Sequence, residues 1–187
     1  MPPTPRLPWR AVAASTAIAL AAAVGTAALL SNGSDGAETT TIALTPDGVA
    51  PSIEGAAFTT FDGTKVALTS LRGTATVVNF FSSTCTPCIK EMPAFEQVWQ
   101  ELGSQVAFVG LAVADRPEDA QALVRQTGVT YRTAQDTDGS VITALGGTVL
   151  PTTVLIDADG KVVASHSGEL TATALRALLA DKLHIAS

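Results

Sequence analysis

The spacing of hydrophobic and polar residues divides the chain into three parts. Residues 1–30 end in an unbroken stretch of uncharged, mostly apolar residues that runs from Ala11 to Leu30. Residues 31–48 are rich in Ser, Gly, Thr and Asp and have no regular hydrophobic period, which predicts a flexible tether. Residues 49–187 alternate short apolar runs with amphipathic segments, which predicts one folded domain of ordinary size.

Within residues 49–187 the pattern predicts both strands and helices. The expected strands are 56–61, 65–69, 74–81, 106–114, 131–135, 152–156 and 161–165. The expected helices are 85–102, 116–126, 139–145 and 171–183. Turn signals at 62–63 and 157–160 predict two β-hairpins. Strand–helix–strand units give parallel strands and hairpins give antiparallel ones, so the expected fold class is α/β with a mixed central sheet flanked by helices.

The charges around the first apolar stretch predict its orientation. Arg6 and Arg10 precede the stretch, and the first acidic residue is Asp35. A helix of about 20 residues spans roughly 30 Å, which is enough to cross a bilayer. The positive-inside rule leaves the arginine end in the cytoplasm, so residues 1–30 are predicted to be a signal anchor or a cleaved signal peptide. Both interpretations predict an extracytoplasmic domain, anchored to the cell membrane or secreted if the leader is cleaved.

Composition excludes several classes of function. The net charge is -6, with 11 basic and 17 acidic residues, whereas surfaces that bind nucleic acid are basic. The chain has 2 cysteines, too few for the disulfide framework of a small secreted domain. Two cysteines are also too few for a structural zinc site, which uses four protein ligands. The pair therefore requires an explanation of its own.

The two cysteines, Cys85 and Cys88, follow an expected buried strand and open an expected helix. At a helix N-terminus the unpaired N–H groups and the positive end of the helix dipole favour thiolate over thiol, and thiolate is the attacking species. Residues three apart share a helix face, so the pair can close a small disulfide. We predict a redox-active CxxC motif in which Cys85 is the nucleophile and Cys88 is the resolving thiol.

Other interpretations of the cysteine pair explain less. A structural bridge that closes so short a loop adds little stability. A c-type haem site needs histidine directly after the second cysteine, and Ile89 stands there. We expect no metal and no cofactor beyond the disulfide itself.

Several motifs together resemble the TlpA/ResA/CcmG branch of the thioredoxin superfamily. They are 77–81 (VVNFF), 85–88 (CTPC), 91–93 (EMP), 128–130 (GVT), 150–153 (LPTT) and 155–161 (LIDADGK). The resemblance covers roughly residues 49–183. It implies a thioredoxin-like fold with an N-terminal β-hairpin extension, and thiol-disulfide oxidoreductase activity.

The resemblance also implies a substrate-binding surface around the cysteines. Pro151 matches the family's cis-proline beside the cysteine pair, and Leu150 would offer its backbone to an extended substrate chain. Thr84, Thr86 and Pro87 are expected to border the same substrate. Thr84 stands where the family usually has tryptophan, which removes a flat apolar surface and leaves substrate preference open.

Glu91 matches the acid that this branch places just after the active site. It lies three residues beyond Cys88, so one helix face carries both. A nearby carboxylate raises the pKa of a thiol and can accept or return its proton. Asn79 stands where thioredoxin itself has a buried acid, so proton handling can pass to Glu91. The alternative interpretation is an ordinary glutamate in the first turns of a helix, where the dipole favours it.

The expected function is thus an extracytoplasmic oxidoreductase for protein thiols and disulfides. The resemblance favours a reductant, with cytochrome c maturation as a candidate process and a membrane thiol transporter of the CcdA or DsbD type as its electron donor. One alternative is an oxidase that forms disulfides in exported proteins. A second is a peroxiredoxin, although no proline precedes Ser82 in 77–81. A third is a copper-delivery protein, which would need a further ligand such as His166.

Overall fold

A computed structural model of the protein describes residues 50–185, which form one compact unit. The predictions for residues 1–30 and 31–48 concern residues outside this description. None of the helices formed by residues 50–185 combines the length and the apolar character that crossing a bilayer requires.

A mixed sheet of seven strands forms the centre of the domain, in the order β2-β1-β5-β4-β3-β6-β7. The parallel pairs are β3 with β4 and β4 with β5, and the other pairs are antiparallel. The strands are β1 Ala57–Thr59, β2 Lys65–Ala67, β3 Thr76–Phe81, β4 Ala107–Val113, β5 Arg132–Asp136, β6 Thr152–Ile156 and β7 Val162–Ser167. The predicted fold class, with a central mixed sheet and an N-terminal hairpin, is confirmed.

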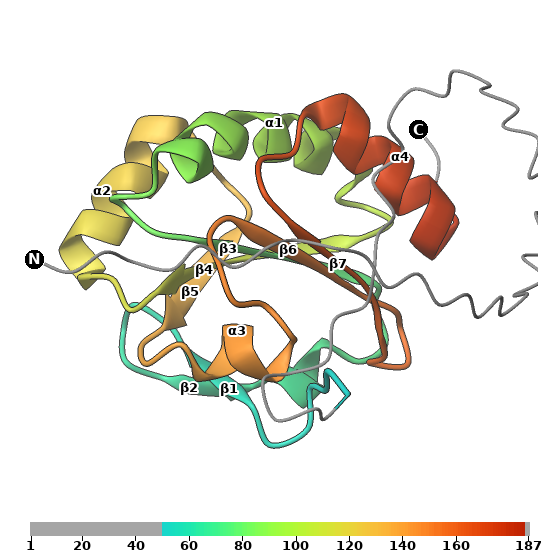
Figure 1. Ribbon diagram of the computed structural model, residues 1–187, viewed down its shortest axis with the longest axis horizontal. Helices are drawn as coiled ribbons and strands as arrows, with labels where there is room; N and C mark the ends of the chain where they lie inside the picture. Colours follow the sequence, from blue (N-terminus) through green and yellow to red (C-terminus); the bar gives the residue numbers. More distant parts are fainter. Residues whose placement is uncertain (1–49, 186–187) are drawn as a thin grey trace, which may run out of the picture. The chain divides into compact units, whose positions relative to one another are not determined.

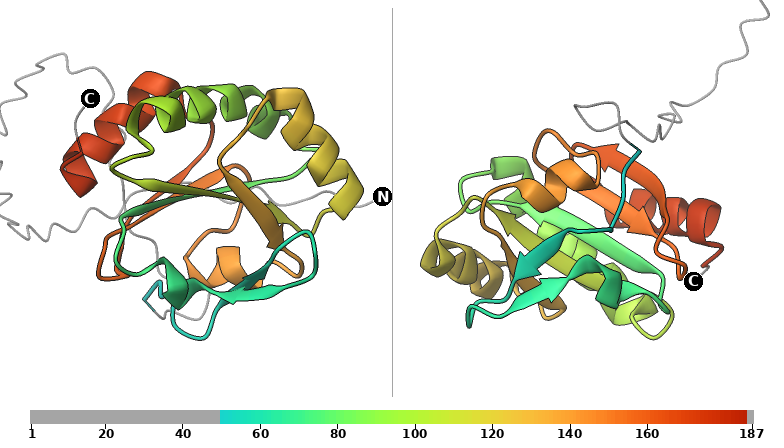
Figure 2. Two further views of the ribbon diagram at one scale, coloured as in Figure 1. Left: turned by 180° about the vertical axis from the view of Figure 1, so that it is seen from behind. Right: turned by 90° about the horizontal axis from the view of Figure 1, so that it is seen from below.

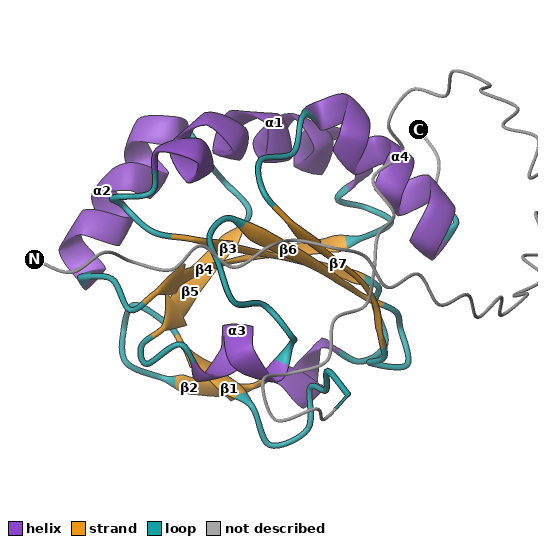
Figure 3. Cartoon of the chain, viewed as in Figure 1, coloured by secondary structure: helices purple, strands orange, loops and turns teal. Residues whose placement is uncertain are grey.

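Helices cover the two faces of the sheet unequally. Three helices, α1 (Thr86–Leu102), α2 (Pro117–Thr127) and α4 (Ala172–Leu183), lie along one face (Figures 1 and 3). The short α3 (Ser140–Ala144) and the β1–β2 hairpin lie toward the other face, as the view from below shows (Figure 2). The sheet therefore separates two apolar clusters.

The central strand β3 contributes side chains to both clusters. Val77 and Phe81 belong to the cluster under the three long helices, whereas Val78 and Phe80 belong to the cluster under α3. All six residues of β3 are buried. This explains why the strand has an unbroken apolar and β-branched sequence rather than an alternating one.

The predicted elements occur with boundaries shifted by at most two residues. One prediction was wrong in part, because the strand expected over 65–69 ends at Ala67. Residues Leu68–Leu71 form a 3-10 turn instead, with Leu68 and Leu71 both buried. Residues three apart eclipse one another in a 3-10 turn, so this conformation places both leucines against the same cluster.

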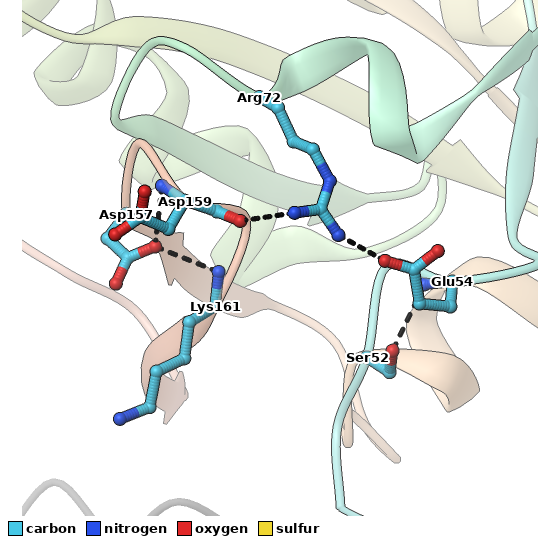
Figure 4. A network of polar contacts seen from close by, with 6 residues as sticks. All are labelled: Ser52, Glu54, Arg72, Asp157, Asp159 and Lys161. Carbon is cyan, nitrogen blue, oxygen red and sulfur yellow. Dashed lines mark hydrogen bonds and ion pairs between the residues drawn. The ribbon is translucent and has the colours of Figure 1, made fainter.

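A network of polar contacts, the N-terminal clasp, closes the end of the sheet where β3 begins (Figure 4). The Arg72 guanidinium donates to the backbone carbonyl of Asp159 at 2.7 Å and forms an ion pair with Glu54. The turn between β6 and β7 is held by Asp157, whose carboxylate accepts from the N–H groups of Asp159 and Lys161. Since β3 leads from this end toward Cys85, the clasp and the cysteines lie at opposite ends of the sheet.

Candidate active site

The cysteine pair lies where β3 passes into α1. Cys85 is the N-cap of α1 and is half-buried, whereas Cys88 in the first turn is fully buried. A disulfide joins them, with their Cα atoms 5.3 Å apart. The N–H of Cys88 also points to the Cys85 sulfur at 3.3 Å. An accessible sulfur backed by a buried one, at a helix N-terminus, suits nucleophilic attack from Cys85 and resolution by Cys88.

Asp115, which the sequence analysis did not single out, fixes the loop that carries Cys85. It follows β4, and its carboxylate accepts from the Ser83 N–H at 2.5 Å and from the Ser83 hydroxyl at 2.8 Å. A third donor to this carboxylate is the N–H of Arg116 at 2.9 Å. Because β3 and β4 are parallel, their carboxyl ends meet at one edge of the sheet. An acid directly after the second of two buried parallel strands was the signal available in the sequence.

The predicted substrate-binding residues lie around this end of the sheet. The Leu150–Pro151 peptide bond is cis, and Thr152 pairs with Phe80 near the end of β3. Pro151 is buried and its carbonyl accepts from the Gly168 N–H at 2.9 Å. Leu150 is half-buried and contacts both apolar clusters. Beside it, the apolar side chain of Val149 is 54% exposed.

The residues that flank the cysteines are accessible. Thr84 and Thr86 are exposed and Pro87 is half-buried, and their predicted contact with a substrate stays a prediction. Pro87 occupies the first turn of α1, where its missing N–H costs nothing. Within residues 50–185, no group of three or more His, Cys, Asp or Glu side chains is arranged to hold a metal ion.

Glu91 lies inside the protein, one turn beyond Cys88. Only 1% of its surface is exposed. Its carboxylate accepts from the Asn79 amide at 2.8 Å and from the Leu170 N–H at 3.1 Å. Burial raises the pKa of Glu91 to about 7, although these two hydrogen bonds oppose the rise and the charge of Glu169 adds to it. A carboxyl group with this pKa can take up or release a proton near neutral pH.

Tyr131 extends the hydrogen-bonded chain beyond Asn79. Its hydroxyl donates to the Asn79 side-chain oxygen at 3.5 Å, and burial raises its pKa, so it stays protonated as a donor. A Cβ atom added at Gly110 would lie only 3.1 Å from the ring of Tyr131. The three-residue spacing put Glu91 and Cys88 on one face of α1, but it gave no sign of Tyr131 or Leu170, because only the folded chain brings these residues near Asn79 and Glu91.

The sheet, the covering helices and the disulfide at the start of α1 define a thioredoxin-fold protein with a dithiol–disulfide site. The chain belongs to the AhpC/TSA family, whose model matches residues 46–165.

Curated relatives carry the name thiol-disulfide oxidoreductase ResA. One from Halalkalibacterium halodurans is 33% identical over 111 residues, which cover 59% of this chain and 63% of that protein. One from Bacillus thuringiensis is 33% identical over 122 residues, which cover 65% of this chain and 70% of that protein. The chain thus spans just under two thirds of the length of the first of these relatives.

Among solved structures, the fold is similar to a DsbF homologue from Corynebacterium diphtheriae. The two chains are 27% identical, with a TM-score of 0.64, and the match covers 80% of this chain and 97% of the other. The fold and the family predicted from the sequence motifs are therefore confirmed.

Proposed function

We propose that the protein is a thiol-disulfide oxidoreductase that exchanges the Cys85–Cys88 disulfide with protein substrates. The observation that carries the proposal is a disulfide between an accessible and a buried cysteine at a helix N-terminus, one turn from a buried carboxyl group. The name of the ResA relatives, thiol-disulfide oxidoreductase, supports the same activity.

In the reducing direction, the Cys85 thiolate attacks one sulfur of a substrate disulfide. The substrate S–S bond breaks, its other sulfur leaves as a thiolate that takes up a proton, and a mixed disulfide with Cys85 forms. The Cys88 thiolate then attacks the Cys85 sulfur and releases the second substrate sulfur. Two electrons pass to the substrate, and the Cys85–Cys88 disulfide is left behind. The oxidising direction is the reverse of these steps.

The second step needs Cys88 without its proton, although Cys88 is buried. We assign Glu91 as the group that accepts this proton and returns it in the reverse reaction. Three observations support the assignment: the shared face of α1, the burial of both side chains, and a Glu91 pKa of about 7. A base whose pKa lies near the working pH transfers protons efficiently in both directions.

The physiological setting is part of the proposal. We propose an extracytoplasmic reductant, anchored to the membrane by residues 1–30, that reduces disulfides in proteins such as apocytochrome c. Its electrons would come from a membrane thiol transporter of the CcdA or DsbD type. The arginines before the apolar stretch and the resemblance to the TlpA/ResA/CcmG branch support this setting.

The reduction potential of the cysteine pair tests the direction of electron flow. The purified full chain is equilibrated with glutathione or dithiothreitol buffers, and the fraction of disulfide is measured. We expect a value near that of thioredoxin, about -270 mV, which suits an electron donor. A value near that of DsbA, about -120 mV, would instead identify an oxidase of exported proteins. If no reversible couple appeared, the proposed activity would be wrong, and peroxide turnover and Cu(I) binding would be measured next.

A further inference from the structure

A row of polar residues crosses the sheet beneath Glu91. Asn79 on β3 pairs with Thr153 on β6, and Thr153 pairs with His166 on β7. Strand side chains alternate between faces, so all three point to the face covered by α1 and α4. The next row on the same face consists of Val77, Leu155 and Ala164, which are all apolar. The polar row is thus confined to the level of the buried carboxyl group.

The middle residue of this row has an unpaired hydroxyl group. Thr153 is fully buried, and its Oγ1 is the one buried side-chain oxygen or nitrogen within residues 50–185 that has no hydrogen-bond partner in the protein. Directly opposite residues in a sheet have Cβ atoms about 5 Å apart, so the Thr153 hydroxyl lies next to Asn79, which contacts Glu91. Buried polar groups of this kind bind internal water.

The outer residue of the row reaches solvent. His166 is half-buried on β7, the edge strand of the sheet. Its ring lies against the loop after β7, with Nε2 3.9 Å from where a side chain on Gly168 would begin. The same loop supplies the Leu170 N–H that binds Glu91. The polar row therefore leads from the buried carboxyl group to the edge of the sheet.

We propose that Thr153 and His166, with water bound at the Thr153 hydroxyl, form the route by which Glu91 exchanges protons with solvent. The proposal rests on the proposed function, because it gives the proton of Cys88 a path out of the protein. In the reducing direction Cys88 gives its proton to Glu91, and the carboxyl group then passes a proton through the water to His166 and solvent. In the oxidising direction the proton returns by the same path. Thr153 and His166 are positioning residues and touch no substrate.

Other titratable groups face Glu91 and must be considered in any pH profile. Cys88 precedes it by one turn of α1, and Tyr131 reaches it through Asn79. Glu169, in the loop after β7, raises its pKa by charge. None of these groups lies on a path across the sheet to its edge, whereas Thr153 and His166 do.

The test compares Thr153→Val with Thr153→Ser in the full chain. The rate of exchange with a peptide disulfide is measured from pH 5 to 9, in H2O and in D2O. We expect Thr153→Val to be about tenfold slower, with a larger solvent isotope effect, because its proton transfer becomes limiting. Thr153→Ser keeps the hydroxyl and should keep the wild-type rate and isotope effect. Thermal unfolding of each variant checks that it is folded.

A matched control and a double variant complete the test. Thr76→Val makes the same change at a buried residue of β3 on the other face, and it should leave exchange unchanged. If Thr153 acts through Glu91, adding Thr153→Val to Glu91→Gln should slow exchange no further. A Thr153→Val protein that exchanges as fast as the wild type would overturn the proposal, whatever its stability, since the hydroxyl would then have no part in proton transfer. If the wild type itself showed no exchange, the proposed function would fail instead.

Discussion

At the scale of single residues, Glu91 is a buried acid whose hydrogen bonds only partly offset the effect of burial on its pKa. It receives two hydrogen bonds, from Asn79 and Leu170, yet burial still raises its pKa to about 7. The three-residue spacing from Cys88 predicted its helix face. Its partners, on β3 and after β7, were not predictable, because they depend on how the helix docks on the sheet. The acid could therefore be identified from the sequence, but the contacts that set its pKa could not.

Replacing Glu91 by Gln should make stability less dependent on pH. The carboxyl group has an ordinary pKa of 4.5 in the unfolded chain and about 7 in the folded protein. Between these values the folded protein holds a proton that the unfolded chain has released, so raising the pH destabilises the wild type. Glu91→Gln has no such proton, and the Asn79 amide can turn over to accept from the new side chain. The free energy of unfolding of Glu91→Gln should therefore exceed that of the wild type by an amount that grows with pH to about 3 kcal/mol above pH 7.

Urea unfolding of the disulfide form from pH 4 to 8 measures this difference. Glu118→Gln, at an exposed residue in the first turn of α2, is the matched control and should follow the wild-type curve. Parallel curves for the wild type and Glu91→Gln would show that Glu91 is already ionised in the folded protein.

At the scale of elements, hydrophobic spacing predicted most strands and helices because each buries a regular face. The apolar residues expected to line one side of the helix after the cysteines, Met92, Phe95, Val98 and Leu102, are all buried. The strand predicted over 65–69 was too long by two residues, because so short an apolar pattern does not distinguish a strand from a 3-10 turn. Loop contacts such as Asp115 with Ser83 have no periodic signal, so the way the active-site loop is held was not predicted.

Removing the Asp115 carboxylate should loosen the junction between β3 and α1. Asp115→Ala leaves the Ser83 N–H without an acceptor, and losing these charged hydrogen bonds should cost about 1–3 kcal/mol of unfolding free energy. Exchange by Cys85 should also slow, because the loop before it is no longer fixed. Chemical denaturation and exchange kinetics measure the two effects. Asp119→Ala is the control, because it removes only the exposed ion pair in which Asp119 lies 3.6 Å from Arg116, and it should change little. Equal effects of the two substitutions would contradict the prediction.

At the scale of the whole molecule, the N-terminal clasp and the disulfide occupy opposite ends of the same strands. β3 starts near Arg72 and ends near Cys85, and β6 returns from Pro151 to the turn at 157–160. Six residues of strand separate the two ends by about 20 Å. Stability and chemistry should therefore respond separately to changes at the two ends.

Gly160→Ala should destabilise the fold without changing the reduction potential. Gly160 has a φ of 85°, and an added Cβ would lie 2.5 Å from the Ile53 side chain. Backbone strain and overpacking together should cost about 2–4 kcal/mol. Gly128→Ala is the matched control, because its φ is 74° but nothing lies within 4 Å of an added Cβ, so it should lose only about 1 kcal/mol. Denaturation curves and redox titrations of both variants measure this, and a shift in potential for Gly160→Ala would contradict the separation of the two ends.

The turn between β6 and β7 is a suitable place to attach the protein to a solid support. Asp159 lies there in the solvent, at the end of the sheet away from Cys85. A crosslinker or an unnatural side chain introduced at position 159, with its backbone carbonyl still free to bind Arg72, would fix the domain to a resin or an electrode. Every immobilised molecule would then present its disulfide to the surrounding solution, so that turnover on the surface should match turnover of the free protein.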